Sequence, residues 1–379
     1  MLPKSNVHKG RSAVMLTVLT VAMGLSGIAY GKTLKLITGD GPGHDGTKAM
    51  VTWASDLEKE SKQGLAGKVY PQTLASAKEV PSTLNSGTAD LGYIVYPYFP
   101  AEFPEANFIA EFSLFASNTA AAAGAATEYV LNCADCLEEL KRHGMIFLGN
   151  TANAPYSLIT KKPITTHADF QNLKVRSGGE AWGRWIEALG GVKVQLPATE
   201  AYQALSQGML DAHTHSIGSL VDQSLADVAK YVTDIPAGVY FGTSMNFSRK
   251  NWDALTDAQR LEIYDRVPYL LSKYISNLVV SRDDVKNNRL DELGVKIVQP
   301  AEDLSTAHAE FLKKDKNVII DNAKKIYGIN NAQEKADHFL GLLEKWEKLA
   351  EGYGADSQEL GDLFKREIFD KFSVAEISR

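Results

Sequence analysis

Three titratable side chains lie close together near position 213. Asp211, His213 and His215 alternate with other residues, and a β-strand places alternate side chains on one face of its sheet. Imidazole and carboxylate groups ligate zinc and other transition ions, so this spacing permits a metal site and metal-dependent hydrolysis. Two simpler interpretations remain open: His215 contacts a ligand directly, or the histidines pack in a core.

Motifs of common enzyme classes are missing from the sequence. It has no G-x-S-x-G elbow and no H-E-x-x-H pair. The glycine-rich segment 39–43 lacks the G-x-x-x-x-G-K-[ST] pattern that cradles phosphates, which disfavours nucleotide binding. We therefore predict a protein that is not an enzyme and that needs no cofactor and no resident metal. A metal-dependent hydrolase that uses Asp211, His213 and His215 is the alternative.

The N-terminus has the pattern of a secretory signal. Lys4, Lys9 and Arg11 precede an apolar run over 13–29, and Ala29 and Gly31 supply the small residues that signal peptidase requires. A membrane anchor would need about 20 apolar residues, and Thr and Gly dilute this run. We predict a cleaved signal peptide over 1–31 and a periplasmic protein, so the hydrolase alternative would also be periplasmic.

The charge balance argues against nucleic acid as a partner. Removing Lys4, Lys9 and Arg11 from the 40 basic residues leaves 37 against 46 acidic ones, a net charge of −9. The sequence also has no basic tract and no segment in which aromatic and basic residues interleave. A hydrophobic fraction of 44% and a charged fraction of 23% are typical of a globular chain that buries a full core.

The chain has two cysteines, Cys133 and Cys136. An oxidising compartment favours a disulfide between them, and free buried thiols are the other structural interpretation. A thioredoxin-like redox pair usually opens a helix after a strand, whereas this pair falls inside a helical pattern. A zinc site lacks a second pair of ligands nearby.

Strands and helices alternate along the chain and must position these residues. We expect strands over 32–38, 67–70, 91–95 and 192–196, and helices over 47–61 and 80–85. From Thr256 a long helical pattern runs toward Asn288. A strand over 296–299 follows, and the chain from Ala301 onward is nearly all helical. The alternation predicts an α/β fold with parallel crossovers.

A weak internal repeat suggests two similar α/β lobes. Residues 84–90 read LNSGTAD and residues 205–211 read LSQGMLD. Each copy looks like a helix, a glycine that ends it, and an aspartate that leads into a strand. Chance similarity between short helix ends is the alternative.

Ordered sequence segments link the chain to a known family. In chain order they are VYP at 69–71, LNSGTAD at 84–90, DFQNLKVR at 169–176, LGGV at 189–192, LP at 196–197, EAYQAL at 200–205, GMLD at 208–211 and NWDAL at 251–255. By order and spacing the chain, from about Leu34 to about Leu304, resembles the solute-binding proteins of tripartite ATP-independent periplasmic (TRAP) transporters, the DctP-like family.

This resemblance implies a two-lobed periplasmic binding protein fold with hinge strands, a long lobe-spanning helix and a helical C-terminal tail. We expect lobe I over 32–153 plus 242–281, lobe II over 154–241 plus 282–340, and a helical extension over 341–379. The implied function is capture of a small organic carboxylate between the lobes. The implied partners are that organic acid and the integral membrane subunits of a TRAP transporter.

The resemblance places the family's ligand-binding arginine at Arg176. A planar guanidinium holds a carboxylate with two parallel charge-assisted hydrogen bonds. Some relatives carry a second arginine upstream, where this chain has Asn153 and Tyr156, so a second carboxylate clamp is in doubt. Many relatives have an asparagine where this chain has the segment His213–His215. These departures favour a monocarboxylate over a dicarboxylate.

Aromatic residues fall where the lobe edges should line the cleft. Tyr98 and Phe99 belong to this group, and Asp40 and His44 can contact ligand hydroxyls from their glycine-rich loop. An aromatic set beside one arginine suits an acid with an apolar or aromatic body, although a single aromatic is more often a core residue. The predicted ligand contacts are Arg176, Tyr156, His215, Tyr96, Asn153, Trp182, Asp40, His44, Tyr240 and Phe241.

Overall fold

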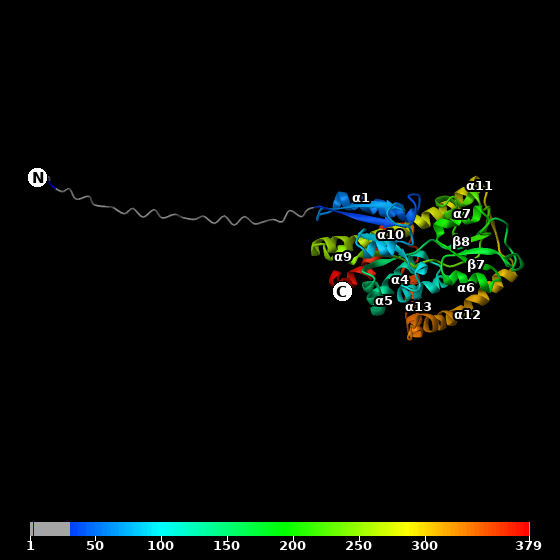
Figure 1. The fold of residues 1–379 in the computed structure, drawn as a ribbon. Coiled ribbons are helices and arrows are strands. Elements are labelled where there is room, and N and C mark those ends of the chain that lie inside the picture. Colours follow the sequence, from blue (N-terminus) through cyan, green and yellow to red (C-terminus); the bar gives the residue numbers. More distant parts are fainter. Residues whose placement is uncertain (1–2, 4–30, 379) are drawn as a thin grey trace. The chain divides into compact units, whose positions relative to one another are not determined.

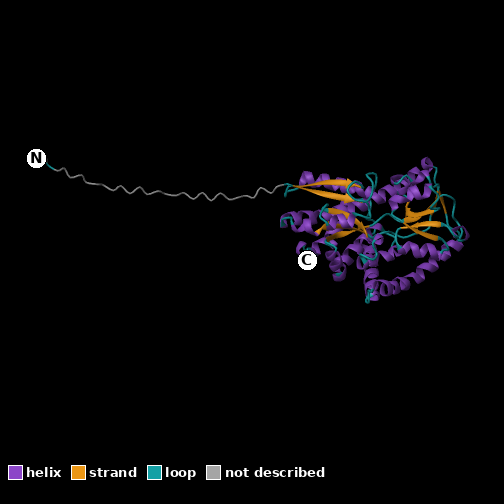
Figure 2. Ribbon diagram, in the orientation of Figure 1, coloured by secondary structure: helices purple, strands orange, loops and turns teal. Residues whose placement is uncertain are grey.

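The computed structural model describes residue 3 and residues 31–378 (Figure 1). The signal peptide predicted over 1–31 therefore lies almost entirely outside the described residues. Strands gather in two separate groups, each with helices around it (Figure 2). We call the part built on the first sheet the first lobe and the part built on the second sheet the second lobe.

The first lobe contains a five-stranded sheet in the order β2-β1-β3-β10-β4. Strand β1 pairs in parallel with β2 and β3, while β10 is antiparallel to both β3 and β4. Parallel strands need helical crossovers, and the chain supplies them between consecutive strands. The strands are β1 (Lys32–Thr38), β2 (Leu65–Pro71), β3 (Leu91–Val95), β4 (Met145–Thr151) and β10 (Thr243–Ser248), and the first two crossover helices are α1 (Asp45–Glu60) and α2 (Val80–Asn85).

The second lobe contains a six-stranded sheet in the order β11-β9-β5-β8-β6-β7. Strand β6 is parallel to β7 and β8, whereas β5 is antiparallel to β8 and β9. Two hydrophobic clusters pack on this sheet, one around Trp182 and Trp185 and one around Leu205 and Leu210. The strands are β5 (Tyr156–Thr160), β6 (Lys174–Ser177), β7 (Val192–Gln195), β8 (Ala212–Ser216), β9 (Tyr231–Thr233) and β11 (Lys296–Val298).

The remaining elements connect and cover these sheets. Those between β3 and β5 are η1 (Tyr96–Tyr98), α3 (Pro104–Phe108), η2 (Ile109–Phe115), α4 (Thr119–Asn132) and α5 (Ala134–Arg142). The second lobe adds η3 (Ala168–Phe170), α6 (Glu180–Ala188), η4 (Ala198–Glu200), α7 (Ala201–Ser206), α8 (Ser219–Asp222) and η5 (Leu225–Asp227). Cys133, between α4 and α5, is joined to Cys136 of α5 by a disulfide with the two Cα atoms 5.2 Å apart.

The internal repeat forms the same local structure in both lobes. The backbone amides of Asp90 and Asp211 each donate to the carbonyl of a strand lysine, and each aspartate side chain accepts a hydrogen bond from the amide of that same lysine. The amide donors are Lys35, 2.7 Å from the Asp90 carboxylate, and Lys174, 3.0 Å from the Asp211 carboxylate. The glycine that precedes each aspartate has a positive φ, as a left-handed helix end requires.

Two chain segments cross between the lobes side by side. The first joins β4 to β5, and the second leads from β9 back to β10 in the first sheet. The Asn153 amide donates to the Tyr240 carbonyl and the Tyr156 amide to the Gly238 carbonyl, each at 2.8 Å. Gly238 has a φ of +76°, and an added Cβ would lie 2.3 Å from the Ser113 carbonyl oxygen, so only glycine fits there.

A long helix, α10 (Asp257–Asp284), follows α9 (Arg249–Asp253). It starts where the long helical pattern was expected to begin, with a capping box in which Thr256 and Gln259 exchange side-chain and backbone hydrogen bonds. It packs on α1, α14 and β4, then continues as a π-helical segment, η6 (Val285–Arg289), and α11 (Leu290–Leu293). No helix of residues 31–378 is both long and apolar enough to span a bilayer.

The C-terminal part of the chain is helical, as predicted, and packs mainly on the first lobe. Helix α12 contacts α6 in the second lobe and η2 and α13 in the first (Figure 1). In α13, Trp346 is fully buried against Gly124 of α4 and donates to Glu128 at 2.7 Å. The predicted boundary at 341 falls inside α13. These elements are α12 (Glu302–Tyr327), α13 (Ala332–Leu349), α14 (Ser357–Glu367), η7 (Phe369–Lys371) and α15 (Val374–Ile377).

Candidate functional site

Arg176 is a buried cation held in place from both lobes. It lies in β6, in register with Val194 of β7 and His213 of β8, and only 2% of its surface is exposed. Its Nε donates to the Leu196 carbonyl at 2.8 Å, and its Nη2 donates to the Tyr98 hydroxyl at 3.1 Å. Tyr98 belongs to η1, directly after β3 of the first sheet. The guanidinium is therefore oriented by a strand neighbour on one side and by the opposite lobe on the other.

No protein carboxylate neutralises this arginine within the described part of the chain. Both partners of the guanidinium are uncharged oxygens. Burial of an ion without a counter-ion costs on the order of several kcal/mol, and proteins usually offset this cost by pairing the charge. The Nη1 group takes part in neither bond, so the geometry leaves donors of the fork for an external anion.

A cavity of about 40 Å³ lies beside the guanidinium, between the two lobes. Seven of the ten predicted ligand contacts line it: Asp40, His44, Asn153, Tyr156, Arg176, His215 and Tyr240. The other lining residues are Val95, Tyr98, Gly178, Ala198, Gln223, Thr243 and Tyr274. Folding thus gathers residues as far apart in the sequence as Asp40 and Tyr274 around one arginine.

Three predicted contacts do not line this cavity. Tyr96 is 1% exposed, and its hydroxyl bonds Ser244 at 2.9 Å inside the first lobe. Phe241 is fully buried in the core of the first lobe. Trp182 packs behind Tyr156, with ring centroids 5.1 Å apart, and donates to the Ala237 carbonyl. These side chains point into the core, and their sequence position alone could not distinguish that from the cleft.

Stacked rings form one wall of the cavity. Tyr156 stacks on His215 with ring centroids 4.8 Å apart, and His215 stacks on His213 at 5.0 Å. The Tyr240 ring lies nearly parallel to Tyr156 at 6.3 Å. Asn153 donates to the Tyr156 hydroxyl at 2.8 Å and fixes the ring at the cavity edge. This flat wall offers an aromatic surface next to the charged fork.

The electrostatics of the cavity are dominated by Arg176. Burial, reinforced by the nearby guanidinium, lowers the pKa of His215 to about 3 and that of His213 well below its ordinary value. Both imidazoles are therefore neutral near pH 7. Burial also raises the pKa of Tyr156 and Tyr240, which keeps both hydroxyls protonated. Among the lining residues Arg176 is the only arginine or lysine.

Asp211, His213 and His215 do not form a metal site. The Asp211 carboxylate bonds the Lys174 amide and belongs to the repeated turn described above. His213 and His215 stack face to face, an arrangement that does not converge their nitrogens on one point. In the described residues, the one group with three candidate ligand atoms close together is Glu105, Cys133 and Cys136. Its cysteines are consumed by the disulfide.

Tyr274, Thr243 and Gln223 line the cavity but were not expected from the sequence. Tyr274 reaches it from α10, where a helical apolar pattern looks like ordinary core. Its ring passes over Gly46 at the start of α1, and an added Cβ at Gly46 would lie 2.1 Å from that ring. The glycine was the one available signal, because it marks a close approach of another element.

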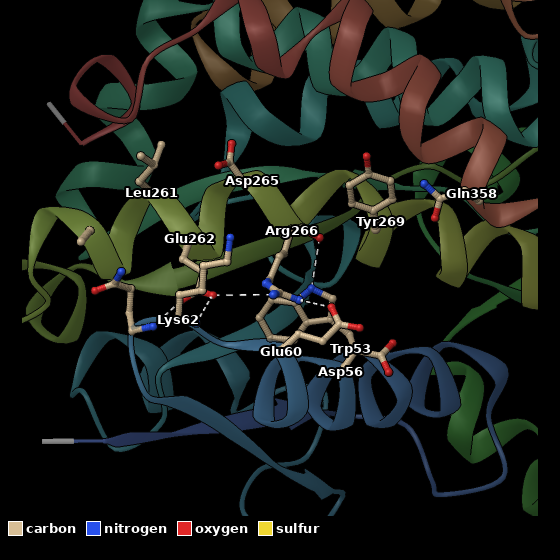
Figure 3. Close-up of a pocket in the computed structure, with 12 residues that line it drawn as sticks. Trp53, Asp56, Glu60, Lys62, Leu261, Glu262, Asp265, Arg266, Tyr269 and Gln358 are labelled. Carbon is tan, nitrogen blue, oxygen red and sulfur yellow. Dashed lines mark hydrogen bonds and ion pairs between the residues drawn. The ribbon is translucent and has the colours of Figure 1, made fainter. Parts of the chain in front are cut away.

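A larger hollow of about 620 Å³ lies between α1 and α10, away from Arg176 (Figure 3). Its one arginine, Arg266, lies 3.1 Å from Glu60 and 3.6 Å from Glu262. Figure 3 shows Arg266 of α10 directed toward Glu60 of α1. Unlike Arg176, the arginine of this hollow is therefore already paired with carboxylates.

Comparisons with known proteins agree with this architecture. A solute-binding protein of Albidiferax ferrireducens is 25% identical over 288 residues, which cover 75% of this chain and 82% of the relative. A TRAP periplasmic solute-binding protein of Bordetella bronchiseptica with bound mandelate superimposes with a TM-score of 0.71 at 21% identity, covering 83% of this chain and 99% of that one. A TRAP solute-binding protein of Rhodoferax ferrireducens in complex with benzoate gives 0.73 at 20% identity, covering 84% and 99%.

The fold class predicted from the sequence is thereby confirmed. The two structural neighbours cover both sheets and share the two-lobed arrangement. The family described as bacterial extracellular solute-binding protein, family 7 (DctP), matches residues 40–318, which include the cavity residues from Asp40 to Tyr274. The chain belongs to the DctP family of bacterial extracellular solute-binding proteins.

Proposed function

We propose that the protein captures a small organic monocarboxylate with an aromatic or apolar body and delivers it to the membrane subunits of a TRAP transporter. The observation that carries this proposal is a buried arginine, Arg176, with no carboxylate partner among the described residues. The proposed role is binding without catalysis. Export by the signal peptide over 1–31 would bring the mature chain to the periplasm.

The chemistry of a guanidinium supports a carboxylate as the guest. Its planar fork matches the two oxygens of a carboxylate and donates two charge-assisted hydrogen bonds. Arg176 is already oriented by the Leu196 carbonyl and the Tyr98 hydroxyl, so little rotamer freedom is lost on binding. The closed cleft excludes water, which strengthens the ion pair.

The rest of the lining supports a single carboxylate and a flat body. His213 and His215 are neutral, and no second arginine or lysine faces the cavity, so a second carboxylate would be left unpaired. The wall of Tyr156 and Tyr240 suits a ring. Mandelate and benzoate, held by the two structural neighbours, are aromatic acids with one carboxylate each.

The size of the cavity implies that the lobes move apart to admit the ligand. A volume of about 40 Å³ accommodates a few water molecules rather than a ring-bearing acid, since one water needs about 10–15 Å³ of such space. The paired crossing segments at Asn153 and Tyr156 are the places where a hinge motion can act.

A binding assay on the mature chain, residues 32–379, tests the proposal. We expect benzoate or a related aromatic acid to raise the melting temperature and to give a calorimetric Kd. Replacing Arg176 with Ala should weaken binding by at least about 100-fold, because charged hydrogen bonds contribute about 1.5–3 kcal/mol each. Arg176→Lys should also bind poorly, because it loses the fork.

A matched variant, Arg266→Ala, removes an arginine of the larger hollow and should bind like the parent. Circular dichroism of each variant checks the fold. If Arg176→Ala binds the acid as tightly as the parent, or if dicarboxylates such as succinate bind while monocarboxylates do not, the proposal is wrong.

A further inference from the structure

Besides the Tyr240 hydroxyl and His215 Nδ1, two buried side-chain oxygens near the cavity receive no hydrogen bond from the described residues. They are Gln223 Oε1 and Asp222 Oδ1, at the C-terminal end of α8. A buried acceptor without a donor is unfavourable, and native proteins leave few of them. The C-terminal end of a helix calls for donors rather than acceptors, so a carboxylate there does not stabilise the helix.

The two residues line two neighbouring spaces, the first of which contains Arg176. Gln223 lines the cavity that contains Arg176, and Asp222 lines a second hollow of about 170 Å³. The two spaces share four lining residues, Asp40, His44, Ala198 and Gln223, so they adjoin at that wall. A ligand whose carboxylate is held by Arg176 and whose body points through this wall reaches Gln223 first and Asp222 next.

The two spaces differ in the charged side chains that line them. The guanidinium of Arg176 marks one end, whereas no arginine or lysine lines the outer hollow. The Asp40 carboxylate lies there, 3.7 Å from the His44 ring, and Asp45 is already paired with Lys48 at 2.7 Å. The His44 Nδ1 accepts a hydrogen bond from the Gly46 amide, so that atom cannot donate to Asp222 or Gln223.

We propose that the ligand carries a hydrogen-bond donor, a hydroxyl or N–H group, at the end distal to its carboxylate, and that Gln223 and Asp222 accept it. The inference rests on the proposed function and narrows it. The ligand class becomes an aromatic monocarboxylate with a hydroxyl or amino substituent on the ring. Arg176 then supplies the affinity common to all carboxylates, and the α8 end selects among them.

Matched acids measure the contribution of the donor. Calorimetry on residues 32–379 compares benzoate with 3-hydroxybenzoate, 4-hydroxybenzoate and 3-aminobenzoate. We expect at least one donor-bearing acid to bind about tenfold tighter than benzoate or better, as one hydrogen bond to a charged acceptor gives. The methyl ethers 3- and 4-methoxybenzoate, which keep the bulk and lose the donor, should show no such gain.

Two variants locate the acceptors. Gln223→Leu and Asp222→Leu should bring the Kd of the preferred donor-bearing acid to within about twofold of the Kd that the same variant has for benzoate. Gln207→Leu, an exposed glutamine outside the cavity, is the control and should keep the full gain. Circular dichroism establishes that each variant is folded.

The outcomes separate this inference from the proposed function. If no aromatic acid binds the parent, the proposed function fails, and the inference fails with it. If benzoate binds and no donor-bearing acid gains over it, only the inference is overturned. A gain that persists in both folded variants also overturns it. If a leucine variant does not fold, the parent alone tests the inference by its affinity for hydroxybenzoates and methoxybenzoates. A site that prefers only bulk would bind both kinds of acid tighter than benzoate, and that result would overturn the inference.

Discussion

Tyr98 is a residue through which the first lobe positions the guanidinium. Its hydroxyl accepts one hydrogen bond from Arg176 Nη2 and one from the Ala198 amide, each at 3.1 Å. We expect Tyr98→Phe to weaken carboxylate binding about five- to tenfold, since a lost hydrogen bond costs about 1 kcal/mol or more. Calorimetry with the best ligand measures this change. Tyr327→Phe, which lies outside the cavity, should have no effect, and an unchanged Kd in Tyr98→Phe would refute the positioning role.

The raised pKa of Asp222 predicts that the preference for a hydroxylated acid over benzoate depends on pH. Burial raises the pKa of this carboxyl to about 6; the neighbouring Asp45 and Asp40 also raise it, and His44 and Lys48 oppose them. Below pH 6 the group is protonated and loses the charge that strengthens its bond to a ligand donor. The advantage of a hydroxylated acid over benzoate should therefore be largest above pH 7 and shrink severalfold by pH 5.

Calorimetry at pH 8 and pH 5 checks this ratio. Benzoate controls for other effects, because carboxyl groups of such acids titrate near 4 and the ligand stays mostly ionised at pH 5. Asp222→Asn, which cannot titrate, should show the same ratio at both pH values. A ratio that falls equally in that variant would assign the pH effect to another group.

Sequence reasoning selected seven of the residues that line the cavity, but not Gln223, which also lines it, nor the neighbouring Asp222. Arg176 could be selected because it lies in a recognisable segment. Asn153 and Tyr156 stand where some relatives carry a second arginine, and His215 lies in the segment where many relatives carry an asparagine. Gln223 and Asp222 carry no such signal, because a polar pair after a short helix is typical of a solvent-exposed turn. Only the fold brings that turn against the loop of Asp40 and His44.

At the scale of elements, the repeated turn explains Asp211 without a metal. We expect Asp211→Ala to lower the free energy of unfolding by about 1–2 kcal/mol, because the Lys174 amide loses its charged acceptor. Urea titration measures this loss, and ligand affinity should be unchanged. The equivalent variant in the other lobe, Asp90→Ala, should behave alike. Stoichiometric zinc in the parent that disappears in Asp211→Ala would contradict this assignment.

The contact between α1 and α10 sets one edge of the cavity. Gly46→Ala would gain helix propensity, about 0.5–1 kcal/mol, but would place a Cβ 2.1 Å from the Tyr274 ring. Overpacking costs about 1–3 kcal/mol, so we expect a net loss of stability and a shift of Tyr274 that weakens binding. Gly341→Ala in α13 has open space around its Cβ and should be neutral or stabilising. Urea titration and calorimetry on both variants test this.

Elements with strong local patterns could be placed from the sequence. The expected strands 32–38 and 91–95 and the helix 80–85 match β1, β3 and α2, and the start of α10 follows from its capping box. Strands β4, β5 and β10 received no prediction, although β5 and β10 are inner strands of their sheets. They are buried on both faces, so they lack the alternation that marks a half-exposed strand.

At the scale of the whole molecule, the C-terminal helices are part of the first lobe's core. Trp346 and Phe339 of α13 are fully buried against α4, whose residues are almost all buried. Each large apolar side chain contributes about 1.5–3 kcal/mol, and several of them approach the total stability of about 5–15 kcal/mol. Deleting 332–379 should therefore prevent the chain from folding, as measured by circular dichroism and solubility.

A shorter deletion, 374–379, removes only α15 and should leave a folded protein with a lower melting temperature. Trp252 donates to Ser378 at 2.8 Å, so this deletion still removes one partner of the core. If the chain without 332–379 folds and binds ligand like the parent, the C-terminal helices are dispensable.

The hydrogen bond between Tyr98 and Arg176 couples the orientation of the guanidinium to the arrangement of the two lobes. One partner lies in each lobe, so the bond exists only while the lobes are together. When the lobes separate, Arg176 loses this hydrogen bond and should hold a carboxylate less tightly. A carboxylate bound at Arg176 should in turn favour the form in which the lobes are together. Ligand occupancy and lobe arrangement would thus change together. A membrane partner that recognises the arrangement with joined lobes would bind the ligand-loaded protein and not the empty one.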